Sequence, residues 1–529
     1  MRTAVALVGL IGAGCVDYDA ARVLCFDTGR CVDLAPDGGR VVTVSFIDTY
    51  LAQGGATTDK PRSLGRPPVA FIDDGGAWVA LPLQGARGVF SATNAPPGHW
   101  LAEYASSQFV DTALDQLDLS ERRAGRVDQE TVPSNAATVH LAVGGLEAWH
   151  SGDQLSLSSP NAGVLSSRLA CGTVGSCPRD LTPGQRAADL WLDWGTLQGS
   201  ARIIPTDVVY VFQLVSLQDD GGVAYQAVRK STSLQGHAIG PGANSDLDAT
   251  LADPPPASAV SMDGIIDSRA FRAASQPLPG AASTSAMSLS VAPVPFGVVP
   301  GADAAPVLLF SELLGADGHA QPERDAGVFV AFDLRTPFPP SWETQLSVVN
   351  WVEGTLQIPS SDGGWEVGQT GEPLTARFRG SYFSTMVSQL VRAPLSVRPL
   401  ISSPRGVTID GQDAQAQSHV VARTQSRVQW GAPSLGTPTF YELDVFRVTI
   451  GVDASGARLA GSSFVGAIRA ANRSITLPPG FLSPGERYFF GVCAWSLPNA
   501  DLSRPMRTTL PSAKACAVTQ VVTARSAPQ

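Results

Sequence analysis

Hydrophobic and polar residues alternate in many short stretches of this 529-residue chain. In 42–46, valine and phenylalanine alternate with threonine and serine, and Trp100, Ala102 and Tyr104 fall on one side of a second alternating stretch. A period of two is typical of a β-strand that buries one face. Only 268–274 has a helical pattern, and it is short. The pattern predicts an all-β protein built from tandem β-sandwich domains.

Four Asp-Gly-Gly triplets lie along the chain, and Asp-Gly supplies the positive φ angles that tight hairpin turns require. Strand-like stretches flank three of them, so we predict β-hairpins around Asp74, Asp220 and Asp362. The fourth triplet begins at Asp37. A calcium loop needs oxygen ligands at alternating positions and a closing carboxylate, and none of the four triplets has them.

Composition supports the β-rich prediction. The chain holds 53 glycines and 40 prolines and only 16% charged residues, so long amphipathic helices cannot dominate it. Its hydrophobic fraction of 44% is ample for packed cores. The net charge of −10, without any cluster of lysine and arginine, argues against nucleic acid and anionic membrane surfaces as partners.

The N-terminus has the features of an export signal. An arginine precedes an apolar run at 4–11 that is too short to span a bilayer, and small residues precede Cys15. This arrangement resembles the lipobox of bacterial lipoproteins, although Gly12 stands where that family usually carries leucine. The resemblance implies a signal peptide at 1–14 and lipidation of Cys15. Two alternatives are a plain secreted protein that loses Cys15 with its signal, and a wrongly assigned start codon.

The other six cysteines fall into three pairs along the chain. An even number remains once the anchor has used one thiol, as expected for a protein that folds in an oxidising compartment. We therefore predict three disulfides: Cys25–Cys31, Cys171–Cys177 and Cys493–Cys516. The first would lie in an N-terminal tether at 15–40, and the second would close a small ring worth about 2 kcal/mol.

The region 400–522 carries a series of motifs in a fixed order. Trp430 follows a strand-like stretch, and 482–494 reads L-x-x-G-x-x-Y-x-F-x-V-x-A. These motifs resemble a fibronectin type III domain. The resemblance implies that Trp430 belongs to the core and that Tyr488 is the corner tyrosine, whose hydroxyl bonds to the backbone near 482–485.

The same resemblance bears on the last cysteine pair. If Tyr488 faces the core, a period of two places Cys493 on the outer face of its strand. Cys516 lies in the stretch that would form the neighbouring last strand. Fibronectin domains usually lack cysteines, but a cross-strand disulfide is sterically reasonable here and would add about 3 kcal/mol.

Two further regions precede this domain. The first, 41–131, contains a Pro-Pro-Gly turn that leads into the strand of Trp100, and it resembles the small transthyretin-like or carboxypeptidase-regulatory-like β-sandwiches. The second, 132–396, is predicted to be either one large β-sandwich or two smaller ones. A proline-rich break at 253–256 is the candidate boundary between two.

The chain shows no sequence pattern for catalysis or metal binding. We find no G-x-S-x-G elbow, P-loop or dinucleotide-binding glycine pattern, and the carboxylates of 111–130 are interpreted as a solvated surface. Trp191 and Trp194 could form an aromatic platform for sugars, but core packing is the favoured interpretation. The histidines are scattered and lack the spacing of zinc ligands: His99, His140, His150, His237, His319 and His419. We predict no catalytic residue, metal ligand or cofactor.

Two functional hypotheses of different class follow. The first is a non-catalytic lipoprotein at the cell envelope, held in the outer membrane or at the cell surface, that acts in binding, adhesion or as a scaffold for a protein or glycan ligand. It would be secreted if it is not lipidated. In its overall form the chain resembles uncharacterised multidomain lipoproteins of myxobacteria. The second is an exported carbohydrate-active or peptide hydrolase with its catalytic domain in 132–396. The first is favoured because catalytic sandwiches normally show a cluster of nucleophiles or ligands.

Overall fold

The chain is described from a computed structural model, in which almost every regular element is a β-strand. The all-β prediction is therefore confirmed. No helix in the described part of the chain is long and apolar enough to cross a membrane. The structure describes residues 23–25, 31–33, 40–52, 55–73, 78–128, 137–172, 177–198, 201–218, 224–240, 245–254, 259–275, 284–294, 308–310, 328–335, 343–356, 374–386, 395–416, 418–421, 425–452, 458–507 and 509–525.

The N-terminal module comprises residues 40–128 and packs two layers of strands. One layer is a four-stranded sheet in the order β12–β3–β9–β8, and the other runs β7–β6–β10–β11. Val42 and Phe46 from the first layer and Trp100 from the second share one core. The strands of these layers are β3 (Arg40–Ser45), β6 (Ala70–Asp73), β7 (Trp78–Leu81), β8 (Gln84–Ala86), β9 (Val89–Ala95), β10 (Trp100–Ala105), β11 (Gln108–Thr112) and β12 (Gln116–Asp118).

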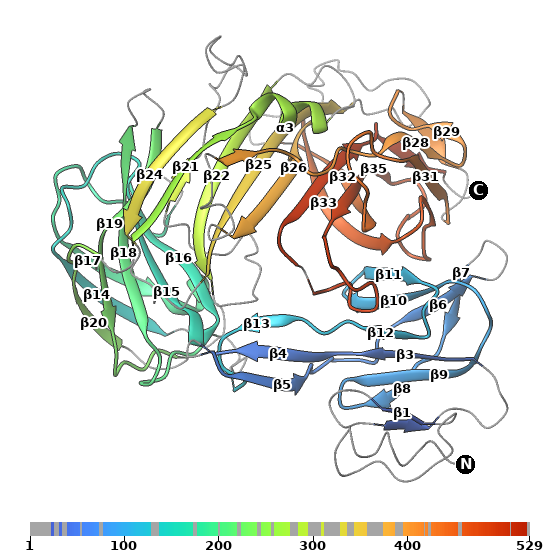
Figure 1. The fold of residues 1–529 in the computed structure, drawn as a ribbon, viewed down its shortest axis with the longest axis horizontal. Helices are drawn as coiled ribbons and strands as arrows, with labels where there is room; N and C mark the ends of the chain where they lie inside the picture. The colour runs from blue at the N-terminus through green and yellow to red at the C-terminus, as the bar shows by residue number, and fades with distance from the viewer. Residues whose placement is uncertain are drawn as a thin grey trace.

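A small third sheet extends the N-terminal module towards the next part of the chain (Figure 1). It pairs β13 (Arg122–Ala124), β4 (Ile47–Leu51) and β5 (Thr57–Pro61) in that order. Beyond β13, the Arg126 guanidinium forms an ion pair with the buried carboxylate of Asp207. This contact ties the N-terminal module to the second module.

The second module comprises residues 137–254 and is a sandwich around its own core. Its outer sheet has the order β17–β14–β20, and its inner strands run β16–β15–β18–β19. Leu141, Leu190 and Leu247 point inward from the three outer strands. The elements are β14 (Thr138–Gly144), β15 (Gln154–Ser159), β16 (Val164–Cys171), β17 (Ala188–Asp193), α2 (Trp194–Gln198), β18 (Val209–Gln218), β19 (Ala224–Leu234) and β20 (Ser245–Thr250).

The middle strands, within 259–397, continue from the second module. The predicted helix at 268–274 is present as α3 (Ser268–Ala274), and the Asp267 side chain caps it by accepting a hydrogen bond from the Ala270 N–H. The strands are β21 (Ala259–Ile266), β22 (Thr284–Val294), β23 (Leu308–Phe310), β24 (Val328–Arg335), β25 (Glu343–Leu356), β26 (Leu374–Met386) and β27 (Leu395–Val397).

The C-terminal module, residues 400–525, is a two-sheet sandwich. One sheet has the order β29–β28–β31–β34, and the other pairs β33–β32–β35–β36, with β37 and β30 attached. The strands are β28 (Arg405–Ile409), β29 (Gln412–Asp413), β30 (His419–Val421), β31 (Arg427–Gly431), β32 (Phe440–Val452), β33 (Arg458–Ala470), β34 (Ser474–Thr476), β35 (Arg487–Ser496), β36 (Ser512–Val518) and β37 (Val522–Ala524).

Two residues that the fibronectin resemblance singled out lie in the core of this sandwich. Trp430 is buried and meets the Tyr441 ring edge-on, with 5.4 Å between ring centroids. The Tyr488 hydroxyl accepts a hydrogen bond of 2.8 Å from the Ser483 N–H, within the backbone stretch that the resemblance implied. The resemblance to the fibronectin family itself stays a prediction.

All three predicted hairpins are flanked by strands that pair antiparallel. In the first, Asp73 of β6 lies opposite Trp78 of β7, and in the second, Gln218 of β18 lies opposite Ala224 of β19. In the third, Leu356 of β25 lies opposite Leu374 of β26. The turns themselves, at 74–77, 219–223 and 357–373, lie outside the described residues.

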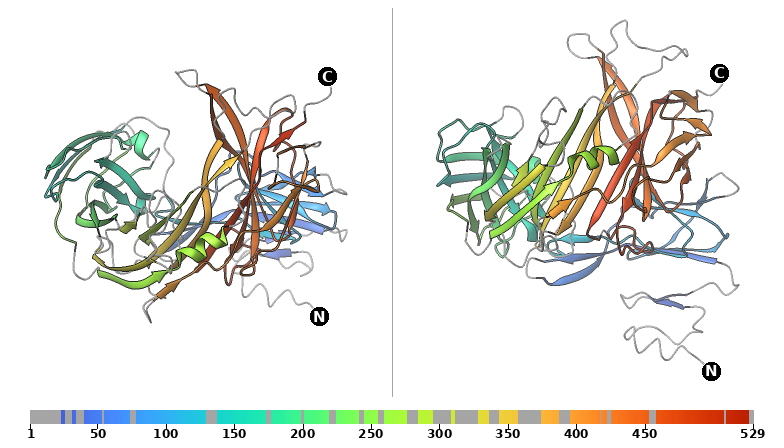
Figure 2. Two further views of the ribbon diagram at one scale, coloured as in Figure 1. Left: turned by 90° about the horizontal axis from the view of Figure 1, so that it is seen from above. Right: turned by 45° about the horizontal axis from the view of Figure 1, so that its top comes forward.

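A single hydrogen-bonded ladder passes through all four parts of the molecule (Figure 1). It crosses between parts where β11 pairs with β33, β36 with β26, and β23 with β19. Its order is β7–β6–β10–β11–β33–β32–β35–β36–β26–β25–β22–β23–β19–β18–β15–β16. Figure 2 shows the middle strands between the second and C-terminal modules. Because β23 pairs with β19 and β26 pairs with β36, these parts share a sheet. The predicted boundaries at 131 and 396 stay predictions.

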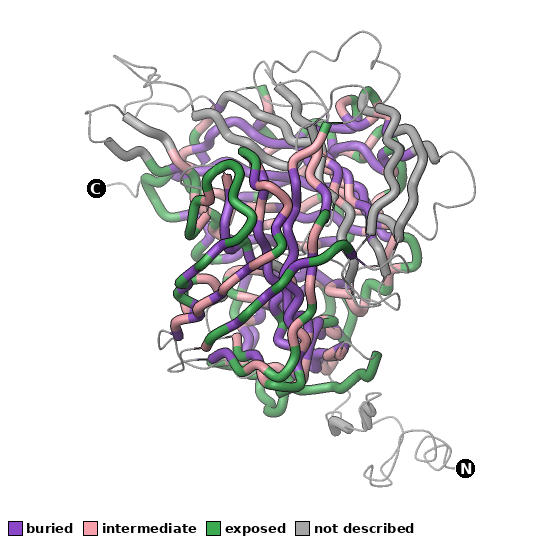
Figure 3. Tube along the Cα trace, turned by 90° about the vertical axis from the view of Figure 1, so that its left-hand side faces the viewer, coloured by how far each residue is buried: buried purple, intermediate pink, exposed green. Residues whose placement is uncertain are grey.

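Burial follows the strand period on the outer side of the second module. Along β17, Ala188, Leu190 and Leu192 are buried while the alternate residues are exposed. Figure 3 looks onto this side, where buried and exposed positions alternate along the strands nearest the viewer. The outer sheet therefore presents one solvated face.

Candidate functional site

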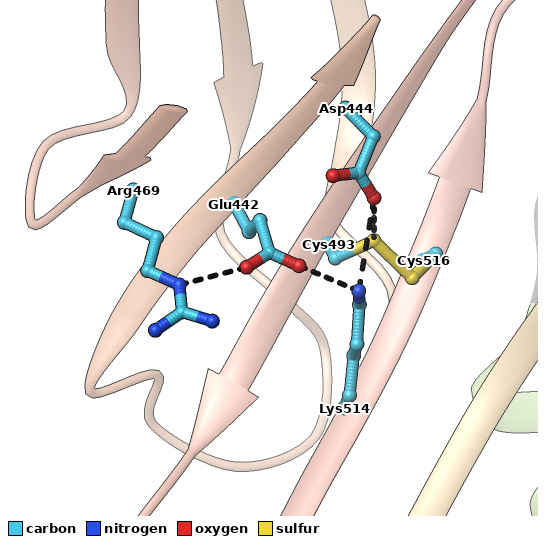
Figure 4. Close-up of a disulfide and its surroundings, with 6 residues drawn as sticks. All are labelled: Glu442, Asp444, Arg469, Cys493, Lys514 and Cys516. Carbon is cyan, nitrogen blue, oxygen red and sulfur yellow. Dashed lines mark hydrogen bonds and ion pairs between the residues drawn. A yellow bond between two sulfur atoms is a disulfide. The ribbon is translucent and has the colours of Figure 1, made fainter. Parts of the chain in front are cut away.

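Four charged side chains lie together in the C-terminal module (Figure 4). Glu442 pairs with Cys493, five positions from Tyr488 on β35, so the four lie on the face opposite the Tyr488 core. The Glu442 carboxylate accepts hydrogen bonds from Arg469 Nε at 2.8 Å and from Lys514 Nζ at 2.7 Å. The Asp444 carboxylate lies 3.7 Å from the same Lys514 nitrogen. We call these residues the charge cluster: Glu442, Asp444, Arg469 and Lys514.

The Cys493–Cys516 disulfide lies beside the charge cluster (Figure 4). The two cysteines face each other on β35 and β36, with their Cα atoms 3.9 Å apart. As the period of two requires, Cys493 is on the face opposite Tyr488, but the expectation that this face is an outer one is wrong. Cys493 is only 1% exposed and Cys516 is 6% exposed.

Other parts of the chain cover this face. The Arg469 guanidinium lies over the ring of Tyr104 from β10, 5.5 Å from its centroid, and donates to the Pro505 carbonyl at 3.0 Å. Met506 packs against the core of the N-terminal module. The N-terminal module and the loop before β36 thus enclose a face that the strand pattern alone left open.

The pKa values of Glu442 and Asp444 are shifted in opposite directions. Burial opposes ionisation of Glu442, but Lys514 and Arg469 outweigh it and lower its pKa to about 2. Burial raises the pKa of Asp444 to about 6 against the charge of Lys514, and the neighbouring Glu442 adds to the rise. At neutral pH both cations of the cluster are matched by carboxylates. We interpret the charge cluster as a structural connection between the N-terminal and C-terminal modules.

The Cys171–Cys177 disulfide is also present, with 5.7 Å between its Cα atoms. It closes a short loop at the end of β16. In the N-terminal tether, Cys25 and Cys31 lie opposite each other in a two-stranded ladder formed by β1 (Val23–Cys25) and β2 (Cys31–Asp33). Cys15 lies outside the described residues.

A polar cleft of about 360 Å³ lies where the loop before β36 meets the N-terminal module. Asp118 lines it and lies 3.5 Å from both Arg504 Nε and Arg507 Nη2. Hydroxyl groups supply much of the remaining lining, among them Ser45 and Ser120, which both donate to the Asp118 carboxylate. Asp118 therefore belongs to an internal polar contact, where the sequence analysis expected a solvated surface.

Two histidines have carboxylate partners that are distant in sequence. His99 Nδ1 lies 3.0 Å from Asp111, whose hydrogen bond raises the pKa of His99. His140 lies between Asp189, 2.5 Å from Nε2, and Asp246, 3.0 Å from Nδ1. The partners are 12 residues apart for His99 and Asp111, 49 for His140 and Asp189, and 106 for His140 and Asp246. Separations of this size carry no short-range sequence signal, so these pairs were not predicted. No group of three or more His, Cys, Asp and Glu side chains in the described chain is arranged to hold a metal ion.

The remaining described histidines lie on other loops and strands. His150 is largely exposed and follows the fully buried Trp149. His237 is half-buried in the loop before β20, and His419 lies on β30. His319 is outside the described residues.

The outer sheet of the second module exposes an aromatic side chain among acidic ones. Trp194 is buried, as expected, but the expectation of core packing is wrong for Trp191, which is 55% exposed. The period of β17 explains the difference, because Leu190 and Leu192 occupy the inward positions. We call the residues on this surface the tryptophan face: His140 on β14, Asp189, Trp191 and Asp193 on β17, and Asp246 and Asp248 on β20.

The Trp191 ring is held in place. It stacks on His140 with 4.4 Å between centroids and 21° between planes. The His140 ring is fixed in turn by Asp189 and Asp246, and the hydrogen bond to Asp189 is the largest cause of its raised pKa. With a carboxylate at each ring nitrogen, the doubly protonated imidazolium satisfies both contacts. Such a surface can receive a planar or cationic group without first ordering the indole.

Comparison with known proteins gives no family for this chain. No protein-family model matches it, and no curated protein matches it at a significant level. Among solved structures, a streptococcal ancillary pilin aligns with 68% of this chain and 98% of its own, at 12% identity and a TM-score of 0.10. A likeness of this size carries no argument about fold or function.

Proposed function

We propose that this chain is a non-catalytic extracytoplasmic protein that acts at the cell surface in binding, adhesion or as a scaffold. The observation that carries the proposal is the continuous ladder of strands through all four parts of the molecule. Shared sheets resist bending between parts more than flexible linkers do. A stiff body of this kind is suited to holding a contact surface at a fixed position.

The joint between β11 and β33 supports this proposal. The Ala467 N–H donates to the Ser107 carbonyl at 3.1 Å, and a Cβ atom at Gly466 would lie 2.2 Å from the same oxygen. The two backbones approach so closely that only glycine fits. Phe109 and Phe481 also pack across the joint, with ring centroids 5.8 Å apart. These contacts favour a fixed relation between the two modules.

Two disulfides within the described chain are the second line of support. Disulfides form and persist outside the reducing cytosol. Together with the lipobox-like start of the chain, they favour an envelope protein anchored by a lipid on Cys15, with a protein or glycan ligand.

The experiment that tests this proposal is the intact mass of protein purified from its native host, with and without alkylation under non-reducing conditions. We expect a chain that begins at Cys15, is heavier by acyl groups and has no alkylatable thiol. A mass for the unprocessed chain with seven free thiols would overturn the extracytoplasmic proposal. Release of products from a polysaccharide or peptide panel would favour the hydrolase hypothesis instead, with its catalytic domain in 132–396.

A further inference from the structure

The edge strand β17 presents an acid–aromatic–acid row to solvent. Asp189, Trp191 and Asp193 are successive outward positions, and all three are exposed. Trp191 has the largest exposed fraction among the large hydrophobic side chains of the described residues. Since His140 covers one face of the indole, the exposed area belongs to the opposite face and the ring edge. A group on that open face would lie between two carboxylates, each two residues away along the strand.

Acidic side chains continue across the sheet. Asp246 and Asp248 are outward positions of β20, and both are exposed. Four carboxylates therefore share this surface with one titratable cation, His140. The guanidinium of Arg179 also reaches β17, where it donates to the Trp191 carbonyl at 3.2 Å. The surface is negative, as is the whole chain with its net charge of −10.

We propose that the tryptophan face binds a basic segment of a partner protein, with an arginine or lysine side chain on the open face of Trp191 between Asp189 and Asp193. This inference rests on the proposed function as a binding or scaffold protein and names the chemistry of its partner. The indole face attracts a cation through its quadrupole, and the flanking carboxylates accept the N–H donors of that cation.

Charge complementarity decides between this partner and a glycan. A neutral sugar can also stack on an indole, but it would leave most of the negative charge of four carboxylates unmatched. An anionic glycan would be repelled. A guanidinium or ammonium group uses both the ring and the charges, and its attraction to this face weakens with salt.

The rigidity of the face favours measurable affinity. Trp191 lies in the middle of a strand and stacks on a ring that is held from both sides, so binding loses little side-chain entropy at the indole. Tryptophan is also enriched among the residues that contribute most to binding at protein interfaces.

The test uses the full mature chain and three defined probes: a peptide of alternating arginine and glycine, the same peptide with glutamate in place of arginine, and a neutral hexasaccharide. Calorimetric titration at low and at high salt measures each. We expect only the arginine peptide to bind, more weakly at high salt. Trp191→Ala should weaken binding by about tenfold or more, and D189N/D193N by a similar factor.

The matched control is Phe464→Ala, which removes an aromatic ring of similar exposure, 49%, from the C-terminal module. It should leave binding unchanged. Asn at position 193 retains an acceptor for the Thr196 N–H that Asp193 now bonds, so the D189N/D193N chain should stay folded, which circular dichroism checks.

Three outcomes would overturn the inference. Arginine-peptide binding that Trp191→Ala leaves unchanged would mean non-specific attraction to a negative chain. Hexasaccharide binding lost in Trp191→Ala would identify a glycan platform, and no binding of any probe would exclude this face as a site for a basic partner. None of these outcomes changes the mass or thiol count, so failure here is distinguishable from failure of the extracytoplasmic proposal.

Discussion

Two strands of the molecule carry nearly the same sequence pattern, but the acidic face of one is buried and that of the other is exposed to solvent. In β32, Glu442 and Asp444 alternate with buried hydrophobic residues, and in β20, Asp246 and Asp248 do the same. The first pair lies under the N-terminal module and the loop before β36, whereas the second faces solvent. The comparison teaches that alternation assigns acidic residues to a face, and that packing between distant segments decides whether that face is covered.

The covered acids required partners that the exposed acids do not. Burying an isolated carboxylate costs several kcal/mol or more, so Glu442 is matched by Arg469 and Lys514. On the tryptophan face, water solvates the carboxylates, and their charge remains available to a partner. The same residue type is therefore structural in one sheet and a candidate for recognition in the other.

The largest effect is expected from Glu442→Gln. It leaves Arg469 and Lys514 buried without their shared anion, which should lower the free energy of unfolding by about 4 kcal/mol. Urea denaturation measures it. The matched variant Asp246→Asn on the exposed face should change stability by less than about 0.5 kcal/mol. Equal effects of the two substitutions would contradict the distinction between covered and exposed acids.

The disulfides sharpen the same comparison. The C493A/C516A variant lacks the buried disulfide, whose cysteines are 23 residues apart, and its free energy of unfolding should be lower by about 3 kcal/mol. The C171A/C177A variant lacks the disulfide at the end of β16, whose cysteines are 6 residues apart, and its free energy of unfolding should be lower by about 2 kcal/mol. Thermal unfolding of the two double variants gives the order, and a larger loss for the shorter loop would argue against it.

The pH dependence of stability should reveal Asp444. Its folded pKa of about 6 lies above the ordinary value of 3.8, so the folded state binds the proton more tightly between about pH 4 and pH 6. The contribution of this group is therefore present at about pH 4 and is lost as pH rises through about 6. As pH rises through about 6, ionisation of Asp444 should lower the free energy of unfolding by on the order of 1 kcal/mol. Asparagine cannot ionise, so Asp444→Asn should not show this decrease. Denaturation of both chains at pH 4.5 and pH 7 checks this, and parallel slopes would contradict it.

The smallest effect concerns His140 on the exposed face. Its pKa should lie above the ordinary 6.5, because Asp189 and then Asp246 bond its ring nitrogens. Asp189→Asn should move this pKa back towards the ordinary value. Titration by nuclear magnetic resonance of the imidazole protons measures the shift, with the largely exposed His150 as an internal reference. Identical values in both chains would mean that the carboxylate does not hold the ring in solution.

Local chemistry made several features predictable. The helix at 268–274 and the hairpins at β6–β7 and β18–β19 involve residues close in sequence. The bond from the Ser483 N–H to the Tyr488 hydroxyl is also local, but it was expected from the fibronectin resemblance. Capping, turn geometry and strand period act over a few residues, so the chain itself records them. The period of β17 places Trp191 and Leu192 on opposite sides, whereas the prediction of core packing for Trp191 rested on the general preference for buried tryptophan.

The amino-acid sequence by itself determined the β-strands, their inward and outward faces and the cysteines available for pairing, because these depend on neighbours along the chain. Only the tertiary structure decided which faces meet. The cover over Cys493, the partners of His140 and the joint between β11 and β33 all bring together residues far apart in sequence. Such contacts depend on how whole sheets pack, and a strand period carries no information about the segment that will lie on its outer face.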